Sequence, residues 1–136
     1  MSWDIFVQDI PSASKSVADI PDDFSPRSIG SRSVIMDAIR TTAPFADFSD
    51  PAWVRIDAPG TNLEINIPTQ DPLESFAFHI HDGDGSAGRV SDVLQRLNLR
   101  AFDPASESGI FDPALANESF HRWQQYRSQV LESRDA

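Results

Sequence analysis

Cysteine is missing from this 136-residue sequence, and lysine occurs only once, at Lys15. Without cysteine the chain can form neither disulfide bonds nor thiolate metal sites, and it has no cysteine nucleophile. No apolar run approaches the roughly 18–20 residues of a membrane-spanning helix, and the N-terminus lacks a basic region followed by an apolar stretch. These absences predict a cytoplasmic protein with no membrane partner.

Positive charge is also scarce. Lysine and arginine total 11 residues against 21 aspartates and glutamates, which gives a formal net charge of −10 at pH 7. A surface of this charge repels the phosphates of nucleic acids at long range and attracts basic proteins. We therefore expect no nucleic-acid partner, and a basic protein is the partner that the charge favours. The alternative is that the charge only keeps the protein soluble, with many aspartates serving turns and helix caps.

Apolar residues, in contrast, are plentiful. They make up 40% of the chain, and three tryptophans and nine phenylalanines are among them. This is enough material for a hydrophobic core and too much for a disordered chain. Because a chain of this length usually builds one core, we expect a single domain over residues 1–136.

Alternation of polar and apolar residues predicts the strands. It covers residues 2–9, 53–57, 62–67 and 75–81. Two short segments, residues 100–104 and 109–113, predict a small hairpin, and both contain Phe-Asp-Pro. That near-repeat is too short to indicate a repeat architecture.

Apolar residues at helical spacing predict three helices. One runs from a cap at Ser31 to about Thr42, one covers residues 86–97 and stops at Asn98, and the last runs from a cap at Asn117 to about residue 132. The order is β-α-β-β-β-α-β-β-α. It predicts an α+β fold with a mainly antiparallel sheet and helices packed on one face.

The pair His79 and His81 is the first candidate site. Strand alternation places both imidazoles on one sheet face, and Glu64 projects from the same face of the preceding strand. Two imidazoles and a carboxylate suit zinc or another divalent transition metal. The His-x-His-x-Asp-His motif of metallo-β-lactamase-like hydrolases is not matched, because Gly83 and Asp84 stand at its last two positions. The alternative is two ordinary histidines on a solvated face.

The segment Asp82-Gly-Asp84-Gly-Ser86 begins like a calcium loop. An EF-hand needs glycine at its sixth position and glutamate at its twelfth, where this chain has Ala87 and Val93. The segment is better interpreted as a strand-to-helix turn in which Asp84 or Ser86 caps the helix. No nucleophile elbow, phosphate-binding loop or dinucleotide fingerprint occurs in the sequence, so an enzyme is not the favoured interpretation.

The long loop over residues 10–30 contains the second candidate site, which we call the acidic loop (residues 19–24). Here Asp19, Asp22 and Asp23 surround two apolar residues, Ile20 and Phe24. Apolar anchors with a rim of carboxylates suit the docking of a basic protein. The alternative is that Ile20 and Phe24 fold back over the sheet as a lid.

Several segments resemble a group of small bacterial proteins to which no activity is attached. They are the opening Met-Ser-Trp-Asp-Ile-Phe-Val-Gln-Asp, then Ile20-Pro-Asp-Asp-Phe24, Asp47-Phe-Ser-Asp-Pro-Ala-Trp53, Asp57-Ala-Pro-Gly60, Glu64-Ile-Asn66 and Leu99-Arg-Ala-Phe-Asp103. The resemblance covers nearly the whole chain and implies a bacterial protein. Members of this group tend to lack the second histidine, which weakens the metal hypothesis.

These observations lead to three hypotheses. The first is an acidic interaction protein that binds and neutralises a basic protein, as immunity proteins bind toxins. The second is a metal-binding module or metal-dependent enzyme that uses His79, His81 and Glu64. The third is a small-molecule binding module that uses the polar sheet face.

Overall fold

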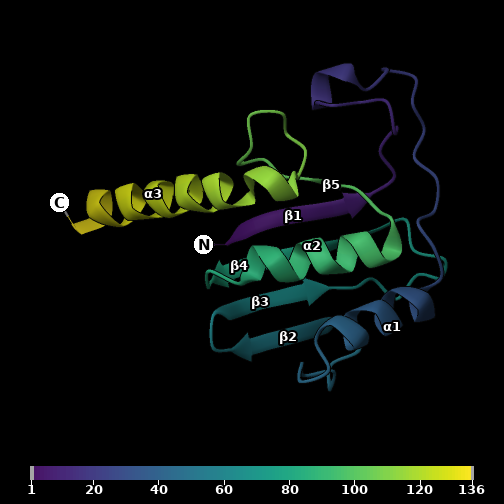
Figure 1. Ribbon diagram of the computed structural model, residues 1–136, viewed down its shortest axis with the longest axis horizontal. Coiled ribbons are helices and arrows are strands. Elements are labelled where there is room, and N and C mark those ends of the chain that lie inside the picture. Colours follow the sequence, from purple (N-terminus) through teal and green to yellow (C-terminus); the bar gives the residue numbers. More distant parts are fainter. Residues whose placement is uncertain (1, 136) are drawn as a thin grey trace.

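The described part of the chain contains one five-stranded sheet, on which the helices pack. The computed structural model describes residues 2–135, with side chains as far as residue 131. The strands are β1 (Trp3–Gln8), β2 (Trp53–Ala58), β3 (Thr61–Asn66), β4 (Ser75–Asp82) and β5 (Ala101–Phe102). Their order is β2-β3-β4-β1-β5, with every neighbouring pair antiparallel (Figure 1). The first strand of the chain therefore lies inside the sheet, between β4 and β5.

The helices leave one face of this sheet uncovered. The α-helices are α1 (Arg32–Thr42), α2 (Ser86–Leu97) and α3 (Ala116–Asp135), and two 3-10 turns are η1 (Val17–Asp19) and η2 (Pro113–Leu115). Helices α1 and α2 pack on the same face, and α3 runs alongside β1 and continues past its N-terminal end (Figure 1). The α+β fold with a mainly antiparallel sheet is thus confirmed. None of the helices in residues 2–135 is both long and apolar enough to cross a membrane.

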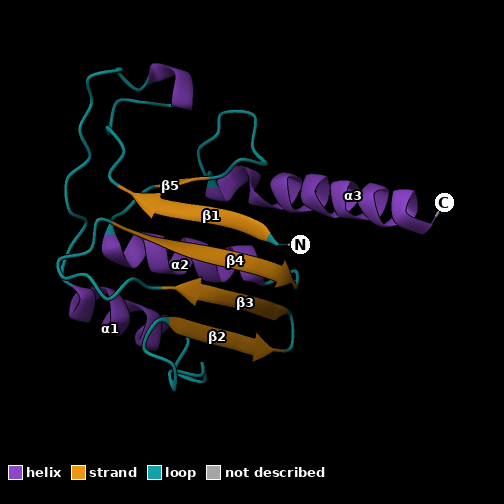
Figure 2. Ribbon diagram, turned by 180° about the vertical axis from the view of Figure 1, so that it is seen from behind, coloured by secondary structure: helices purple, strands orange, loops and turns teal. Residues whose placement is uncertain are grey.

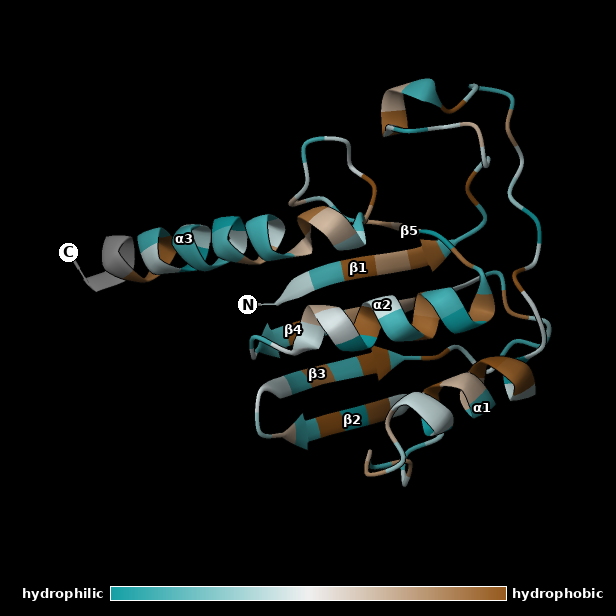
Figure 3. Cartoon of the chain, in the orientation of Figure 1, coloured by the Kyte–Doolittle hydropathy of each residue, from teal (hydrophilic) through white to brown (hydrophobic). Residues whose placement is uncertain are grey.

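Strand alternation determines which side chains form the core. In β1 the residues Trp3, Ile5 and Val7 are buried against the helices, and the residues between them point to the other face. The other long strands alternate in the same way, and together with α1 and α2 they enclose one cluster of buried apolar residues. Figure 3 shows that α3 is mostly hydrophilic beyond its first turns. This helix packs through Phe120 and Trp123, and the ring of Phe120 lies 6.0 Å from that of Trp3.

The first two helices begin and end where their capping residues predict. The Ser31 hydroxyl accepts a hydrogen bond from the Val34 amide at 3.3 Å, which caps α1. Asn98 ends α2 in the left-handed conformation, with φ of 52°. Both predicted spans, to Thr42 and over residues 86–97, are confirmed.

Three local expectations differ from the structure. Neither Asp84 nor Ser86 caps α2, because its N-cap is Gly85. The Ser86 hydroxyl instead donates to the Asp82 carbonyl at 2.7 Å and accepts from the Asn62 amide at 3.2 Å. Asn117 lies inside α3, because η2 runs directly into that helix. The second strand of the predicted hairpin is reduced to a single bridge between Phe102 and Ile110.

Candidate functional site

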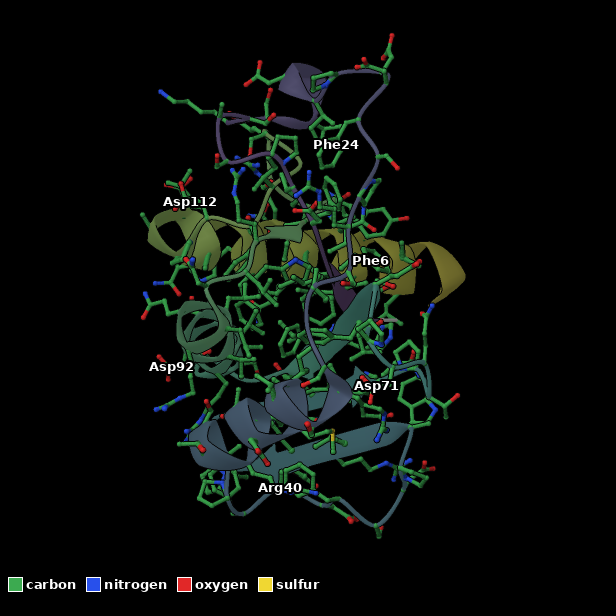
Figure 4. The ribbon with its side chains drawn as sticks, turned by 90° about the vertical axis from the view of Figure 1, so that its right-hand side faces the viewer. Phe6, Phe24, Arg40, Asp71, Asp92 and Asp112 are labelled. Atoms are coloured by element: carbon green, nitrogen blue, oxygen red, sulfur yellow. The ribbon has the colours of Figure 1, made fainter. Side chains whose placement is uncertain are left out.

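Polar and aromatic side chains of separate strands meet on the uncovered side of the sheet, which we call the open face. Figure 2 shows it with no helix in front of the strands. Phe6 of β1 points to this side, opposite to Asp92 of α2 (Figure 4). Besides Phe6, strand alternation places on it Asp4 of β1, Trp53, Arg55 and Asp57 of β2, Asn62, Glu64 and Asn66 of β3, and Ala77, His79 and His81 of β4.

A row of ionisable residues crosses the open face. The register sets Arg55 opposite Glu64, Glu64 opposite His79, and His79 opposite Asp4. Nδ1 of His79 lies 2.7 Å from Oδ1 of Asp4, and the Ser2 hydroxyl donates to the same oxygen. Basic and acidic groups therefore alternate across four strands.

The two histidines have different carboxylate partners. His79 is paired with Asp4, while Nε2 of His81 lies 3.3 Å from Oε1 of Glu64. The structure thus brings Glu64 to His81, as predicted, but directs His79 to a carboxylate that the sequence did not indicate. Among the described residues, no three histidines and carboxylates are grouped so that they could hold a metal ion. A zinc site of His79, His81 and Glu64 stays a prediction, which elemental analysis of untagged protein tests.

Trp53 stands at the edge of a pocket on the open face. Its side chain is 38% exposed, and its ring lies 5.6 Å from the imidazole of His79. The pocket has a volume of about 360 Å³, and its lining residues are Asp47, Ser49, Asp50, Trp53, Arg55 and Glu64. Three carboxylates beside an indole give this pocket the chemistry to receive a cationic side chain.

Asp47 is held in its charged form at the rim of this pocket. Hydrogen bonds from the side chain and the backbone of Ser49 lower the pKa of Asp47 below its ordinary value, and the charge of Arg55 adds to the effect. The Ser49 amide donates to Oδ1 of Asp47 at 2.9 Å. Asp47 therefore remains ionised to a lower pH than an isolated aspartate.

Replacing Ser49 by alanine should raise the pKa of Asp47 toward its ordinary value. The substitution removes the largest cause of the shift and leaves the backbone amide in place. Because the folded-state pKa is depressed, the stability that it contributes is present above the unfolded-state pKa, and it is lost as the pH falls through the folded-state value. A carboxyl NMR titration between pH 2 and about 6 measures the shift. An unchanged Asp47 titration would show that the hydroxyl does not hold the carboxylate.

The acidic loop lies at the other end of β1 from the histidines. It follows the C-terminal end of that strand and projects beyond the sheet, so it does not cover the open face (Figure 1). Asp22 and Asp23 are exposed, whereas Ile20 and Phe24 are half-buried. The carboxylate of Asp19 accepts hydrogen bonds from two backbone amides of the preceding turn, at 3.0 and 3.2 Å. Asp19 therefore has a structural task, while the other two carboxylates are available to a partner.

Other contacts hold the base of the loop in place. The guanidinium of Arg100 donates to the carbonyls of Pro11 and Ser14, and the amide of Val17 donates to the carbonyl of Ser108 at 2.9 Å. The loop is thus tied to residues on both sides of β5. These contacts join residues that lie about 90 positions apart in the sequence.

A groove beside β1 is the feature that the sequence did not indicate. It has a volume of about 640 Å³ and lies between β1 and α3. Its aromatic lining comes from Trp3 and Phe6 on the strand and from Trp123 and Tyr126 on the helix. The one signal in the sequence is Phe6, an aromatic residue on the otherwise polar face of its strand. Tyr126 gave no signal, because it lies outside the apolar stripe of its helix.

Comparison with protein families, with curated proteins and with solved structures finds no match to this chain. The charges and surfaces described above are therefore what supports a function.

Proposed function

We propose that this protein binds a basic protein partner and that the open face is the docking surface. The observation that supports this most directly is an uncovered sheet face that combines carboxylates with exposed aromatic side chains, on a chain with a net charge of −10. The helices cover one face of the sheet, and a partner that binds the open face covers the other.

Trp53 and Phe6 are the apolar anchors of this surface. Their side chains are 38% and 41% exposed, although the residues on either side of Phe6 and the residue after Trp53 are buried in the core. Exposed aromatic residues with a polar surround are typical of interfaces, where truncating an aromatic anchor often costs 2 kcal/mol or more of binding free energy. We infer that the partner covers both rings and removes them from water.

Charge selects a basic partner. Asp4, Asp57 and Glu64 outnumber Arg55 on the open face, and Asp47 and Asp50 add negative charge at the pocket beside it. An arginine of the partner can stack on the indole of Trp53 while it donates hydrogen bonds to a carboxylate of the pocket. The remaining carboxylates steer the encounter from the rim.

The acidic loop provides a second contact in this proposal. Asp22 and Asp23 are exposed at the end of β1 opposite to the histidine pairs. A partner that contacts both the open face and the acidic loop would have its basic surface covered along the whole length of β1. Such coverage neutralises a basic toxin in the manner of an immunity protein, and this is the biological role that we infer.

Two lysine substitutions separate a local docking surface from net charge alone. Asp57→Lys changes the open face, and Asp92→Lys makes the same change of charge on α2, on the opposite side of the sheet (Figure 4). Both residues are exposed, so both variants should fold. We expect Asp57→Lys to weaken binding of the partner at least tenfold and Asp92→Lys to weaken it by less than about threefold.

The partner itself is isolated by capture from the source cell and identified by mass spectrometry. We expect a basic protein that, once purified, binds in a one-to-one complex whose dissociation constant rises with ionic strength. Trp53→Ala should weaken this complex by about thirtyfold, as expected for an aromatic anchor, while Val34→Ala, an exposed apolar residue of α1, should leave it unchanged. An acidic partner, or equal effects of the two lysine variants, would contradict the proposal.

A further inference from the structure

The N-terminal half of β1 has an open edge within the sheet. β5 pairs with β1 only at Phe6 and Val7. Beyond this point the chain turns away, because the amide of Asp103 donates to the carbonyl of Gly109 at 2.9 Å. If the register of Phe6 with Phe102 continued, Pro104 would stand opposite Asp4, and proline has no amide hydrogen to donate.

The backbone groups of Asp4 face this open edge. The carbonyl of Ala101 accepts a hydrogen bond from the amide of Phe111 and so points away from β1. Phe102 and Phe6 are therefore the pair whose backbone groups face each other. Asp4 lies two residues from Phe6, so its amide and carbonyl point to the same edge. Within residues 2–135, no hydrogen bond to these two groups is found on that side.

The groove of about 640 Å³ follows this edge. Asp4 and Phe6 line it from β1, Tyr126 and Arg122 line it from α3, and Pro104 lines it from the segment that follows β5. Asp4 and Phe6 belong to both the groove and the open face, so the two surfaces are continuous. The volume lies within the roughly 300–1,000 Å³ of ligand pockets, but such pockets bury most of a small ligand, whereas this groove is open along a strand edge.

We propose that an extended segment of the partner adds to the edge of β1 at Asp4 and places an apolar side chain between Phe6 and Tyr126. This inference rests on the proposed function, because it takes the occupant to be basic. Strand addition uses backbone hydrogen bonds for affinity and a side-chain pocket for specificity. The backbone amide and carbonyl of Asp4 provide the hydrogen bonds, and the aromatic groove provides the side-chain pocket.

Charge favours a basic segment over a second copy of this chain. Two copies each carry a net charge of −10. Antiparallel pairing of two β1 edges about Asp4 sets the two Asp4 carboxylates opposite each other, and like charges in that position are destabilising. A charged residue on an open edge is also a common protection against self-association. A basic segment brings the opposite charge to the Asp4 carboxylate, and the arginine of the groove lining, Arg122, is itself paired with Glu107 at 3.2 Å.

Selection from a phage-displayed library of random twelve-residue peptides tests this inference on the whole protein. We expect enriched peptides that alternate basic and apolar residues, and a synthetic copy of the strongest serves as the probe. Hydrogen exchange at the Asp4 amide should slow at least tenfold when the peptide binds, while exchange at the Ile5 amide, which faces β4, should not change. Tyr126→Ala should weaken the peptide at least tenfold, and Gln125→Ala, a neighbouring exposed residue outside the groove, should not.

The outcomes separate this inference from the proposed function. Basic peptides that leave the Asp4 amide unprotected overturn strand addition and support the proposed function alone. Peptides without basic residues that protect Asp4 support strand addition and contradict the basic partner. The inference is overturned if the unmodified protein enriches peptides no better than the Phe6→Ala/Tyr126→Ala variant does. It is also overturned if the protein forms a dimer through this edge and the same variant does not.

Discussion

Replacing Gly83 by alanine is expected to lower the free energy of unfolding by about 3 kcal/mol, from the sum of backbone strain and overpacking. Gly83 has φ of 100°, a conformation that residues with a side chain rarely adopt. A Cβ at this position would lie 2.6 Å from the carbonyl oxygen of Gly60 and 2.8 Å from its carbon. That carbonyl accepts a hydrogen bond from the Gly85 amide at 2.7 Å, so it cannot move without losing the bond.

Gly88 provides the matched control for this substitution. It lies inside α2, where an added Cβ meets nothing within 4 Å. Alanine has the higher helix propensity, so Gly88→Ala is expected to raise the free energy of unfolding by about 1 kcal/mol. Urea unfolding of both variants measures the change in the free energy of unfolding, which should be a decrease for Gly83→Ala and an increase for Gly88→Ala. If Gly83→Ala and Gly88→Ala changed the free energy of unfolding equally, the turn between β4 and α2 would be able to rearrange without a loss of stability.

The turn at Gly83 also shows what the sequence could predict. The segment Asp82-Gly-Asp84-Gly-Ser86 predicted a strand-to-helix turn, and the structure confirms it, with β4 ending at Asp82, α2 beginning at Ser86 and a positive φ at Gly83. The prediction that Asp84 or Ser86 caps the helix was wrong, because Gly85 is the N-cap and the Ser86 hydroxyl bonds to Asp82 and to Asn62 of β3. A local pattern therefore predicted the turn, but it could not predict a contact with a strand 24 residues earlier in the chain.

The candidate site was likewise predicted where it depends on a local pattern and missed where it depends on contacts between distant parts of the chain. Alternation placed Glu64, His79 and His81 on one face, because the side-chain period of a strand is local. The pairing of His79 with Asp4 joins residues 75 positions apart and depends on β1 lying beside β4. Nothing in a single strand determines its neighbour in the sheet. The groove is subject to the same limit, because its second wall exists only after α3 has packed against Trp3.

Asp103→Ala is expected to lower the free energy of unfolding by about 3–4 kcal/mol, since the buried indole of Trp3 and the half-buried amide of Ala105 lose their acceptor at roughly 1–3 kcal/mol each. Asp103 is 1% exposed. Its Oδ1 accepts hydrogen bonds from Nε1 of Trp3 at 2.7 Å and from the Ala105 amide at 3.0 Å. The carboxylate thereby ties the start of β1 to the point where the chain leaves its edge, and it fixes one end of the groove.

Asp112 is a control that the chain itself supplies, because both aspartates stand in a Phe-Asp-Pro segment. Asp112 is exposed, and its carboxylate accepts a hydrogen bond from the Ala114 amide at 2.9 Å as the cap of η2. Its replacement by alanine should cost about 1 kcal/mol. The difference between the two variants isolates the contribution of burial and of the bond to Trp3.

A double-mutant cycle with Trp3→Phe tests whether that bond is the cause. In the unmodified protein, Trp3→Phe removes the indole donor and leaves a buried carboxylate oxygen with one bond fewer. In the Asp103→Ala background the indole donor has already lost its acceptor, so the same substitution should cost less. We expect a coupling free energy of about 1–3 kcal/mol, as found for residues that share a hydrogen bond. Additive effects would show that Asp103 stabilises the fold through Ala105 alone, and the edge of β1 would then be positioned by the packing of Trp3 against Phe111 and Phe120.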